Sequence, residues 1–507
     1  MKLIIHHHEK ISRIISLDDN SSVPFEEQHP VKLLQEIGKR FPEEIIGWCD
    51  SSLFSSLDVE NWNKIFHHEF IMASYSISGK FKLLPGIGYV ENSPFLKINF
   101  KNTYPTWQMS TDVGGVSSKI LNLIDKEFFE IQDFALFLNT IAKQGQIHNL
   151  FCYSEPRLLS ASTKEIPISP VTSLKVLFKF VKQNYKLKWS FILLVSYILF
   201  EGKFYITEFI KAIPEKSYRN LNFNLSTVRI NSSKEFSSLQ SVDVIIPTLN
   251  RKPFLINFLI DLQNQTLLPT RVIIVEQNPV PESKSELDFL YNQEWPFKII
   301  HHFTHQPGAC HARNWALERV ESEWVFFGDD DIKIDKDFLQ KGFEKMQQFG
   351  SICSTFSCVE VLGKGLSKEK INQSTVFGAG NSIVKSSVLE GLRFTEKLEF
   401  GYGEDMDFGV QIRNAGVDVI HFPTPQIHHL KANVGGFRTK FTKVWELDGI
   451  KVQPAPTVLW IKSKHFTREQ FFGYKIFYFI SQFQKGNYNL FTLQKRWKRS
   501  YNYSQNL

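Results

Sequence analysis

Three consecutive aspartates, Asp329 to Asp331, end an apolar run in the C-terminal half of the chain, in the segment EWVFFGDDDIKID. Adjacent carboxylates repel one another unless a positive charge lies among them. Carboxylate oxygens are hard ligands that suit Mg²⁺ or Mn²⁺. The run does not fit a twelve-residue calcium loop, which has glycine at its sixth position. It therefore indicates either a divalent-cation site or a plain acidic loop, in which Asp335 or Asp337 caps the following helix.

A second acidic cluster lies in the segment GYGEDMDFGVQIRNAG, where Glu404, Asp405 and Asp407 begin a stretch with helical spacing of apolar residues. Acidic side chains in the first turn of a helix complement the helix dipole, which is a purely structural explanation. The glycines before them, however, allow the backbone to approach a ligand closely. A carboxylate beside a metal-bound diphosphate could act as a general base, so the cluster is a candidate catalytic site.

Two histidines, His428 and His429, follow a predicted strand in the segment HFPTPQIHHLKANVGGFR. A lone histidine is more often a core residue than a ligand, but this pair lies in a region that already has two acidic clusters. Gly435, Gly436 and Arg438 could then form a lid over phosphates, with the Arg438 guanidinium as a charge clamp.

These residues belong to a region, about 241 to 440, in which strand-like and helix-like segments alternate. Such alternation predicts a mostly parallel sheet with covering helices. We expect strands over DVIIPTLNR, RVIIVEQN, FKIIHHF and EWVFFGDDD, each with polar residues at its C-terminal end. In open α/β sheets, ligands bind outside those ends, so the sequence predicts one site at this edge.

Taken in order, the segments resemble the family 2 glycosyltransferases, which have the GT-A fold. VIIPTLNR is similar to the first strand and nucleotide-contacting turn of that family, which implies that Thr248 and Asn250 lie near the donor's base. Glu276 stands where the family often has an aspartate that recognises the nucleoside, and the QNPVPE turn after it lacks the usual Gly-Ser. QPGACHARNWAL resembles the family's glycine-to-ArgAsn segment and implies donor contacts for Arg313 and Asn314.

The same resemblance assigns the metal site. Asp329 and Asp331 match the DxD pair that meets the ribose and the metal-bound diphosphate, and His429 matches a late histidine on the metal side. The resemblance therefore implies that Asp329, Asp331 and His429 hold the metal. Asp330 would neighbour the nucleotide, with its own role open. The resemblance implies a nucleotide-diphospho-sugar donor and a divalent metal, Mn²⁺ or Mg²⁺.

The Glu404–Asp405 pair matches the catalytic position of the family, with Asp405 as the base. The implied mechanism is a single inverting displacement onto a hydroxyl of a glycan or lipid-linked acceptor, as in polysaccharide biosynthesis. A sugar-phosphate nucleotidyltransferase would instead need a glycine-rich loop after the first strand, and TLNRKPF has no glycine. A non-catalytic scaffold or glycan-binding protein with an inactive transferase domain is the other alternative. The retention of both acidic clusters with a histidine argues against it.

Composition sets outer limits on the function. The 507 residues allow about three domains, and Lys and Arg exceed Asp and Glu by 59 − 52 = 7. That surplus fits a phosphate-bearing ligand, an anionic membrane surface or a solvated surface. There is no zinc-finger, RNA-motif or basic-zipper signature, so nucleic acid is not an expected partner. The five scattered cysteines, without a CxxC pair, indicate a reducing, cytoplasmic compartment, and MKLIIHHHEK is not a secretory signal.

The longest apolar stretch, WSFILLVSYILF, has twelve residues, against the roughly 20 needed to cross a bilayer. It predicts a buried helix. Just before it, Lys175, Lys179, Lys182 and Lys186 recur at helical spacing and share one face. That face would either rest on anionic lipid at the inner face of the membrane or be the solvated side of a helix.

Four parts are predicted: an N-terminal α/β region (1–160), a helical basic connector and linker (161–240), the catalytic domain (241–440) and an aromatic, basic helical extension (441–507).

Segments of the first part resemble segments of the third part in the same order, although no strand comparable to VIIPTLNR is evident. IIGWCDSSL parallels WVFFGDDDI with only Asp50 left of the triplet, DVGGVSSKIL parallels FGAGNSIVKSSVL, EIQDFALFLNTIAKQG parallels GEDMDFGVQIRNAG, and FCYSEPRLL parallels FPTPQIHHL. The echoes indicate either a degenerate GT-A-like copy or chance similarity. Such a copy would be a scaffold or acceptor-binding module, with Asp133 as its only candidate base.

Overall fold

The chain folds into two compact units. The computed structural model describes residues 1–79, 86–161, 174–220, 223, 229–237, 240–360, 370–432, 443–446, 452–486 and 489–507. Unit 1 comprises Met1–Lys234 and Phe466–Tyr488, and unit 2 comprises Glu235–His465 and Asn489–Leu507. The boundary near residue 235 lies in the Ser-rich stretch that the sequence indicates as a linker. The last part of the chain is shared between the units, and the four-part division stays a prediction.

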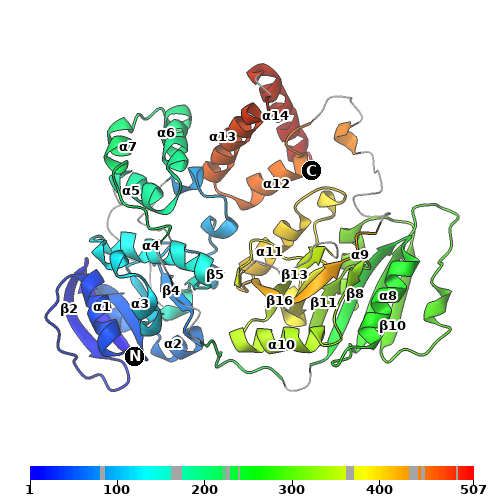
Figure 1. Cartoon of the computed structure of the whole chain (residues 1–507), viewed down its shortest axis with the longest axis horizontal. Coiled ribbons are helices and arrows are strands. Elements are labelled where there is room, and N and C mark those ends of the chain that lie inside the picture. The colour runs from blue at the N-terminus through cyan, green and yellow to red at the C-terminus, as the bar shows by residue number, and fades with distance from the viewer. Residues whose placement is uncertain are drawn as a thin grey trace. The chain divides into compact units, whose positions relative to one another are not determined.

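Unit 2 is built on a nine-stranded sheet with the order β10-β9-β8-β11-β15-β13-β16-β12, in which β14 pairs with β16 (Figure 1). Its strands are β8 (Val242–Leu249), β9 (Arg271–Gln277), β10 (Lys298–Thr304), β11 (Trp324–Gly328), β12 (Ile332–Lys333), β13 (Cys353–Glu360), β14 (Asn372–Gln373), β15 (Asn381–Lys385) and β16 (Ile420–His429). Its helices include α8 (Lys252–Gln263), α9 (Ala309–Leu317), α10 (Phe338–Phe349), α11 (Glu404–Asn414), α12 (Pro456–His465) and α14 (Leu490–Gln505).

The predicted parallel arrangement is confirmed for the four strands β10, β9, β8 and β11. RVIIVEQ in β9 is buried along its whole length, as expected of a strand covered on both faces. The side chains of Ile245, Ile273, Phe327 and Phe408 share one core cluster. Parallel pairing brings the carboxyl ends of these strands to one edge, and β15 runs antiparallel to both of its neighbours.

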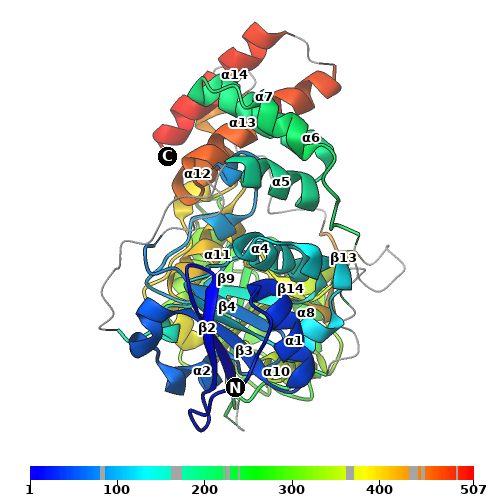
Figure 2. The ribbon, with the colours of Figure 1, turned by 90° about the vertical axis from the view of Figure 1, so that its left-hand side faces the viewer.

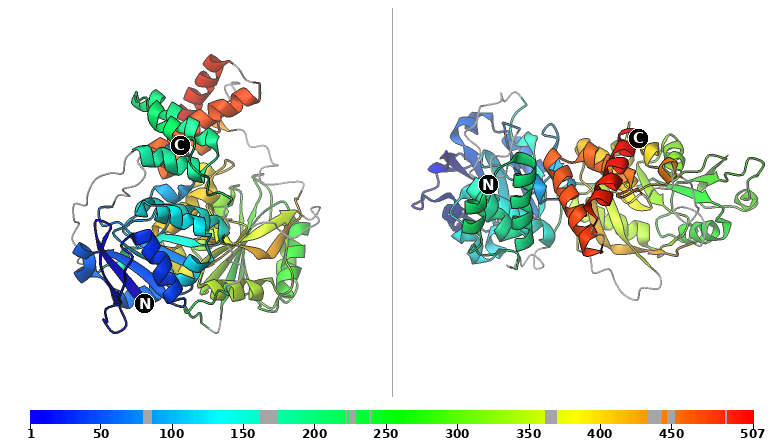
Figure 3. Two further views of the ribbon diagram at one scale, coloured as in Figure 1. Left: turned by 60° about the vertical axis from the view of Figure 1, so that its left-hand side comes forward. Right: turned by 90° about the horizontal axis from the view of Figure 1, so that it is seen from above.

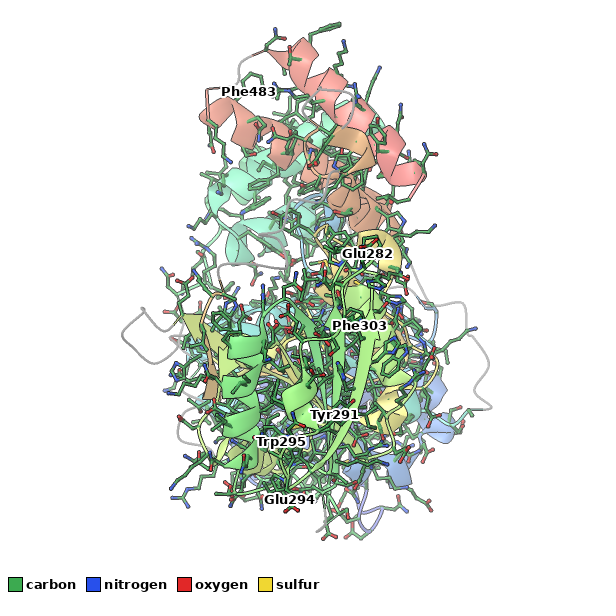
Figure 4. All side chains as sticks on the ribbon, turned by 90° about the vertical axis from the view of Figure 1, so that its right-hand side faces the viewer. Glu282, Tyr291, Glu294, Trp295, Phe303 and Phe483 are labelled. Carbon is green, nitrogen blue, oxygen red and sulfur yellow. The ribbon has the colours of Figure 1, made fainter. Side chains whose placement is uncertain are left out.

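Strand β10 forms the outer edge of this sheet. Figure 4 shows Tyr291 and Trp295, from the segment between β9 and β10, beside this strand and its residue Phe303. The Tyr291 hydroxyl lies 3.2 Å from Nδ1 of His301 on β10. Cover of this kind protects an otherwise unpaired edge.

Unit 1 contains a seven-stranded sheet with the order β2-β1-β3-β6-β4-β7-β5 (Figure 2). Its strands are β1 (Lys2–His7), β2 (Lys10–Ser16), β3 (Ile45–Asp50), β4 (Ile71–Tyr75), β5 (Tyr104–Pro105), β6 (Val113–Ser117) and β7 (Phe151–Ser154). Its helices are α1 (Pro30–Arg40), α2 (Val59–Ile65), α3 (Ser118–Leu123), α4 (Phe134–Gly145), α5 (Leu174–Asn184), α6 (Leu187–Glu201), α7 (Ile206–Ala212) and α13 (Arg468–Gln484). The helices α5 to α7, in green, are seen from two further sides in Figure 3.

Six strands of each sheet share one topology. In unit 2, β8 is parallel to β11, β11 is antiparallel to β15, β15 is antiparallel to β13, β13 is parallel to β16, and β14 is antiparallel to β16. In unit 1, the same relations hold for β1 with β3, β3 with β6, β6 with β4, β4 with β7, and β5 with β7. The order of these strands along the chain is also the same. Such agreement favours the degenerate copy over chance similarity.

The strand pairing also fixes which residues correspond. Ile45 pairs with Ser117, and its echo Trp324 pairs with Lys385, so the first two sequence echoes hold. The echo of FCYSEPRLL with FPTPQIHHL is wrong by four residues, because the pairing through β4 and β13 makes Ser154 the counterpart of His421. A counterpart of VIIPTLNR also exists: β1 holds the place of β8, which its sequence KLIIHH does not reveal.

In its described residues, unit 1 lacks counterparts of three elements of unit 2. Where unit 2 has α8, β9 and β10, unit 1 has only β2, which forms an antiparallel hairpin with β1. Asp50 accepts a hydrogen bond from the backbone N–H of Ser52 and caps a short 3₁₀ helix. Asp133 caps α4 by accepting from the N–H of Leu136 at 2.7 Å. Both carboxylates therefore have structural explanations.

Candidate active site

A cavity of about 410 Å³ lies at the carboxyl ends of the parallel strands of unit 2. Eight predicted site residues line it: Thr248, Arg313, Asp329, Asp330, Asp331, Glu404, Asp405 and His429. They come from β8, α9, the loop after β11, α11 and β16. These eight residues thus meet in one cavity at the sheet edge that the sequence indicates, and they come from segments separated by up to about 180 residues of sequence.

Asp331 and His429 form the pair on one side of the cavity. Strand β12 pairs with β16, and this places Nε2 of His429 3.3 Å from Oδ2 of Asp331. Burial alone would raise the pKa of Asp331, but His429, Arg251 and the N–H of Ala432 hold it below the usual value. His429 is the last residue of β16, not a residue beyond the strand as the sequence suggested.

Asp330 is buried and binds the turn that follows β8. Its two carboxylate oxygens accept from the Thr248 hydroxyl at 2.7 Å and from the Arg251 guanidinium at 2.8 Å. The same guanidinium lies 3.3 Å from Asp331. Burial raises the pKa of Asp330 to about 6, against the effect of Arg251 and Thr248. Arg251 therefore supplies positive charge among the aspartates, and Asp330 positions the predicted nucleotide-contacting turn.

We predict that Asp330→Ala lowers the free energy of unfolding of unit 2 by about 2 kcal/mol, because it leaves buried donors on Thr248 and Arg251 without their acceptor. Chemical denaturation of the metal-free protein measures this change. The matched control is Asp337→Ala, at a half-buried carboxylate paired with Lys341 at the start of α10, which should cost much less. Equal stability of wild type and Asp330→Ala would show that Asp330 does not hold the turn.

Asp329 lines the cavity beside Arg313. Its carboxylate accepts from Nη2 of the buried Arg313 at 2.8 Å, and its side chain remains 40% exposed. Gly380 approaches it so closely that an added Cβ would lie 2.2 Å from Oδ2 of Asp329. Only glycine therefore leaves room for this carboxylate in its observed place.

Asp405 lies on the first turn of α11 and is held by the backbone. Its Oδ1 accepts from the N–H of Ala379 at 3.2 Å, and its carbonyl accepts from the N–H of Phe377. Burial raises the pKa of Asp405 to about 7; Glu404 adds to this rise, and Arg313 opposes it. Burial also raises the pKa of Glu404. A carboxylate that titrates near neutral pH is suited to proton transfer.

The acidic residues at the start of α11 do not all face the cavity. Asp407 is fully buried and accepts from the Thr395 hydroxyl at 2.6 Å, with Nε2 of His465 at 2.5 Å and the Lys464 ammonium at 3.2 Å. Burial opposes these contacts, yet they lower the pKa of Asp407 to about 2. Asp407 thus joins α11 to α12 and does not line the cavity. Two residues along a helix differ by about 200° in direction, which separates it from Asp405.

Three predicted donor contacts do not line the cavity. Asn250 takes a left-handed conformation with φ 53° in the turn after β8. The Asn314 side chain makes two hydrogen bonds with the backbone of Phe394: its amide N–H donates to the carbonyl at 2.9 Å, and its amide oxygen accepts from the N–H at 2.8 Å. Glu276 accepts from Ser285, from the N–H of residue 286 and from His301. Its neighbour Gln277 points to the other face of β9 and lines the cavity instead. The proposed lid residues Gly435, Gly436 and Arg438 lie outside the described residues.

Two charged lining residues were missed from the sequence. One is Arg251, in the TLNR turn. The other is Glu399, whose carboxylate accepts from the N–H groups of Cys310 and His311 at the start of α9. A helix N-terminus favours negative charge, so Glu399 occupies a place that suits an anion. A glycine before the helix, Gly308 with φ 146°, was the available indication of a close approach.

Residues 243–399 match the family described as Glycosyl transferase family 2. The chain contains a family 2 glycosyltransferase domain. Over 202 residues it is 25% identical to the GalNAc(5)-diNAcBac-PP-undecaprenol beta-1,3-glucosyltransferase of Campylobacter jejuni, an alignment that covers 36% of this chain and 63% of that protein. The chain thus spans less than two thirds of the length of this relative.

Similar solved structures include S. aureus TarS 1-349 in complex with UDP-GlcNAc, with 19% identity, a TM-score of 0.36, and coverage of 44% of this chain and 66% of that one. Another is GalNAc-T7 with UDP, GalNAc and Mn²⁺, with 11% identity, a TM-score of 0.36, and coverage of 44% and 48%. The family match confirms the predicted resemblance to family 2 over residues 243–399, and the sheet of unit 2 with its covering helices has the α/β architecture that this resemblance implies. The roles of all the predicted site residues stay predictions, and Asp405 and His429 also lie beyond the matched residues.

The residues of the family 2 domain fit a divalent metal only in part. Among the described residues, no group of three or more His, Cys, Asp or Glu side chains is arranged to hold a metal ion. Asp331 and His429 offer a carboxylate and an imidazole at one place. Mg²⁺ and Mn²⁺ sites of this type take their remaining ligands from substrate phosphates and water. The pair therefore fits a metal that binds together with a diphosphate.

Proposed function

We propose that the chain is an inverting, metal-dependent glycosyltransferase that moves a sugar from a nucleotide-diphospho-sugar to a hydroxyl of a glycan or lipid-linked acceptor. The observation that carries the proposal is the meeting of Asp405 with the Asp331–His429 pair in one cavity. The family 2 domain supports the reaction class. The name of the Campylobacter jejuni relative, which acts on a diphosphate-linked undecaprenol, supports a lipid-linked acceptor.

Each side of the cavity has its own task in this reaction. Asp405 takes the proton of the acceptor hydroxyl while that oxygen attacks the anomeric carbon. The bond between this carbon and the diphosphate oxygen breaks, and the nucleoside diphosphate leaves with the electron pair. A divalent ion held by Asp331 and His429 would neutralise the charge that develops on the diphosphate. Thr248, Arg251 and Asp330 fix the turn that we assign to the nucleotide.

A thermal-shift screen of nucleoside diphosphates with Mn²⁺ tests the donor site. A diphosphate that binds should raise the melting temperature by a few degrees at 100-fold excess over its Kd. The rise should disappear when EDTA replaces Mn²⁺. A folded protein that gives no shift with any nucleotide would favour the non-catalytic alternative.

We further propose that unit 1 has no second catalytic centre, because its sheet lacks the counterparts of β9 and β10. Asp50→Ala is accordingly expected to leave the rate of donor turnover within about twofold of wild type, with only the loss of a helix cap. A nucleoside diphosphate release assay measures this rate. A fall of tenfold or more in a folded Asp50→Ala protein would assign chemistry to unit 1.

A further inference from the structure

The helical hairpin of α6 and α7 in unit 1 exposes large apolar side chains. The two helices lie side by side in Figures 1 and 2. Six residues, which we call the hairpin surface, are exposed by 43% to 71%: Phe191, Leu199, Phe204, Ile206, Ile210 and Ile213. Scattered apolar residues are normal on a protein surface, but a cluster on one hairpin marks an interaction site.

The exposed side chains are distinct from those that pack the hairpin. Ile206, Ile210 and Ile213 recur at i, i+4 and i+7 and share one face of α7. On α6, Leu193 and Tyr197 are buried. The predicted buried helix WSFILLVSYILF is therefore buried on one side only.

Aromatic stacking fixes the packed side of α6 within unit 1. Trp189 stacks on Phe477 of α13, with ring centroids 5.8 Å apart, and Phe200 stacks on Phe472 at 4.5 Å. The packed side thus has its partners in the fold. The exposed apolar residues of α6, Phe191 and Leu199, lie on a different side of the same helix.

Positive charge is concentrated in the same segment. Residues 174–219 contain nine Lys and Arg and three Glu, without Asp, a balance of 9 − 3 = +6 against +7 for the whole chain. The predicted lysine face of α5 does not lie free, because Lys179 pairs with Glu215 at 3.3 Å and Lys182 donates to the carbonyl of Glu215. Lys188, Lys203 and Lys211 belong to the hairpin itself, where Lys203 also pairs with Glu201 at 3.0 Å.

We propose that the hairpin surface binds an anionic lipid bilayer, with its apolar side chains at the acyl boundary and its lysines at the headgroups. Amphipathic helices with basic flanks bind in this way. In the part of the chain that the structure describes, no helix meets the length and apolar character of a membrane span. The helices α6 and α7 have 15 and 7 residues, fewer than the roughly 20 that cross a bilayer, so the proposed binding is at the bilayer surface. Protein interfaces are depleted of lysine at their centres, which favours lipid over a protein partner.

Co-sedimentation of the full chain with vesicles tests the proposal. Wild type should bind vesicles of phosphatidylcholine with phosphatidylglycerol at least about tenfold better than pure phosphatidylcholine, since each lysine near an anionic surface adds to binding. The double variant Phe204→Ser and Ile210→Ser should lose this binding by about tenfold or more. Val280→Ser, at a residue of unit 2 with 57% exposure, is the matched control and should bind like wild type.

Melting temperatures equal to that of wild type confirm that the variants are folded. Absence of binding to anionic vesicles, or equal binding by the double variant, would overturn the proposal. Self-association of wild type that the double variant loses, without vesicle binding, would assign the surface to a second copy of the chain and would also overturn it. Because vesicle binding is measured without donor or acceptor, its outcome is independent of the proposed catalytic function.

Discussion

Asp405→Asn is expected to lower sugar transfer by about 10³-fold, the middle of the range for a general base, while nucleoside diphosphate binds with a Kd within about threefold of wild type. The asparagine side chain can still accept from the N–H of Ala379, so α11 keeps its place. It cannot take the acceptor proton. Donor turnover assays measure the first effect, and calorimetric titration with nucleoside diphosphate and Mn²⁺ measures the second.

The pH dependence gives this prediction a second readout. The base works in its ionised form, and burial, with the adjacent Glu404, raises the pKa of Asp405 to about 7. The rate should therefore fall about tenfold per unit as pH decreases below 7 and should level off above it. Asp337→Asn, at a carboxylate away from the cavity, should keep both the rate and its profile. A fully active Asp405→Asn protein would remove Asp405 from the mechanism.

Asp331→Ala and His429→Ala should each lower metal-dependent turnover by about 10² to 10³-fold, because the charge on the departing diphosphate loses its neutralising partner. Their Mn²⁺-dependent thermal shift with nucleoside diphosphate should disappear as well. His428→Ala is the control that the chain itself provides. Its side chain points to the other face of β16 and does not line the cavity.

Turnover and thermal shift of His428→Ala should match wild type within about twofold. If His428→Ala and His429→Ala lose activity equally, the effect reports damage to β16 and not loss of a metal ligand. If neither Asp331→Ala nor His429→Ala changes the Mn²⁺ dependence, the metal is bound elsewhere or is not used.

The position of the cavity could be predicted from sequence because Thr248, the Asp329–Asp331 run and His429 each lie at or just after the C-terminal end of a strand. The direction of single side chains could not. Glu276 and Gln277 are adjacent and both buried, so alternation along β9 says that they face opposite sides but not which side holds the cavity. Asp405 and Asp407 could have been separated from their spacing on α11. The sequence could not show which of the two would be bound by Thr395 and His465, because these contacts join residues distant in sequence.

Arg251 shows a second limit of sequence reasoning. The aspartate triplet was interpreted as needing a cation, and a guanidinium from the turn after β8 supplies part of that charge. The residue stood in the quoted motif, but its partner lies 79 positions away. The resemblance of unit 1 to unit 2 was visible in the segments around β3 and β6. The role of β1 followed only from its pairing with β3, since KLIIHH has neither the proline nor the polar turn of β8.

The central claim is that one cavity in unit 2 transfers sugar with a metal and Asp405. Its most direct test is the release of nucleoside diphosphate from a panel of nucleotide sugars with Mn²⁺, by wild type and by Asp405→Asn. We predict that wild type turns over at least one donor, that EDTA stops the reaction, and that Asp405→Asn turns over the same donor about 10³-fold more slowly. Turnover that persists in EDTA, turnover by Asp405→Asn at the rate of wild type, or a folded wild type that turns over no donor would contradict the claim.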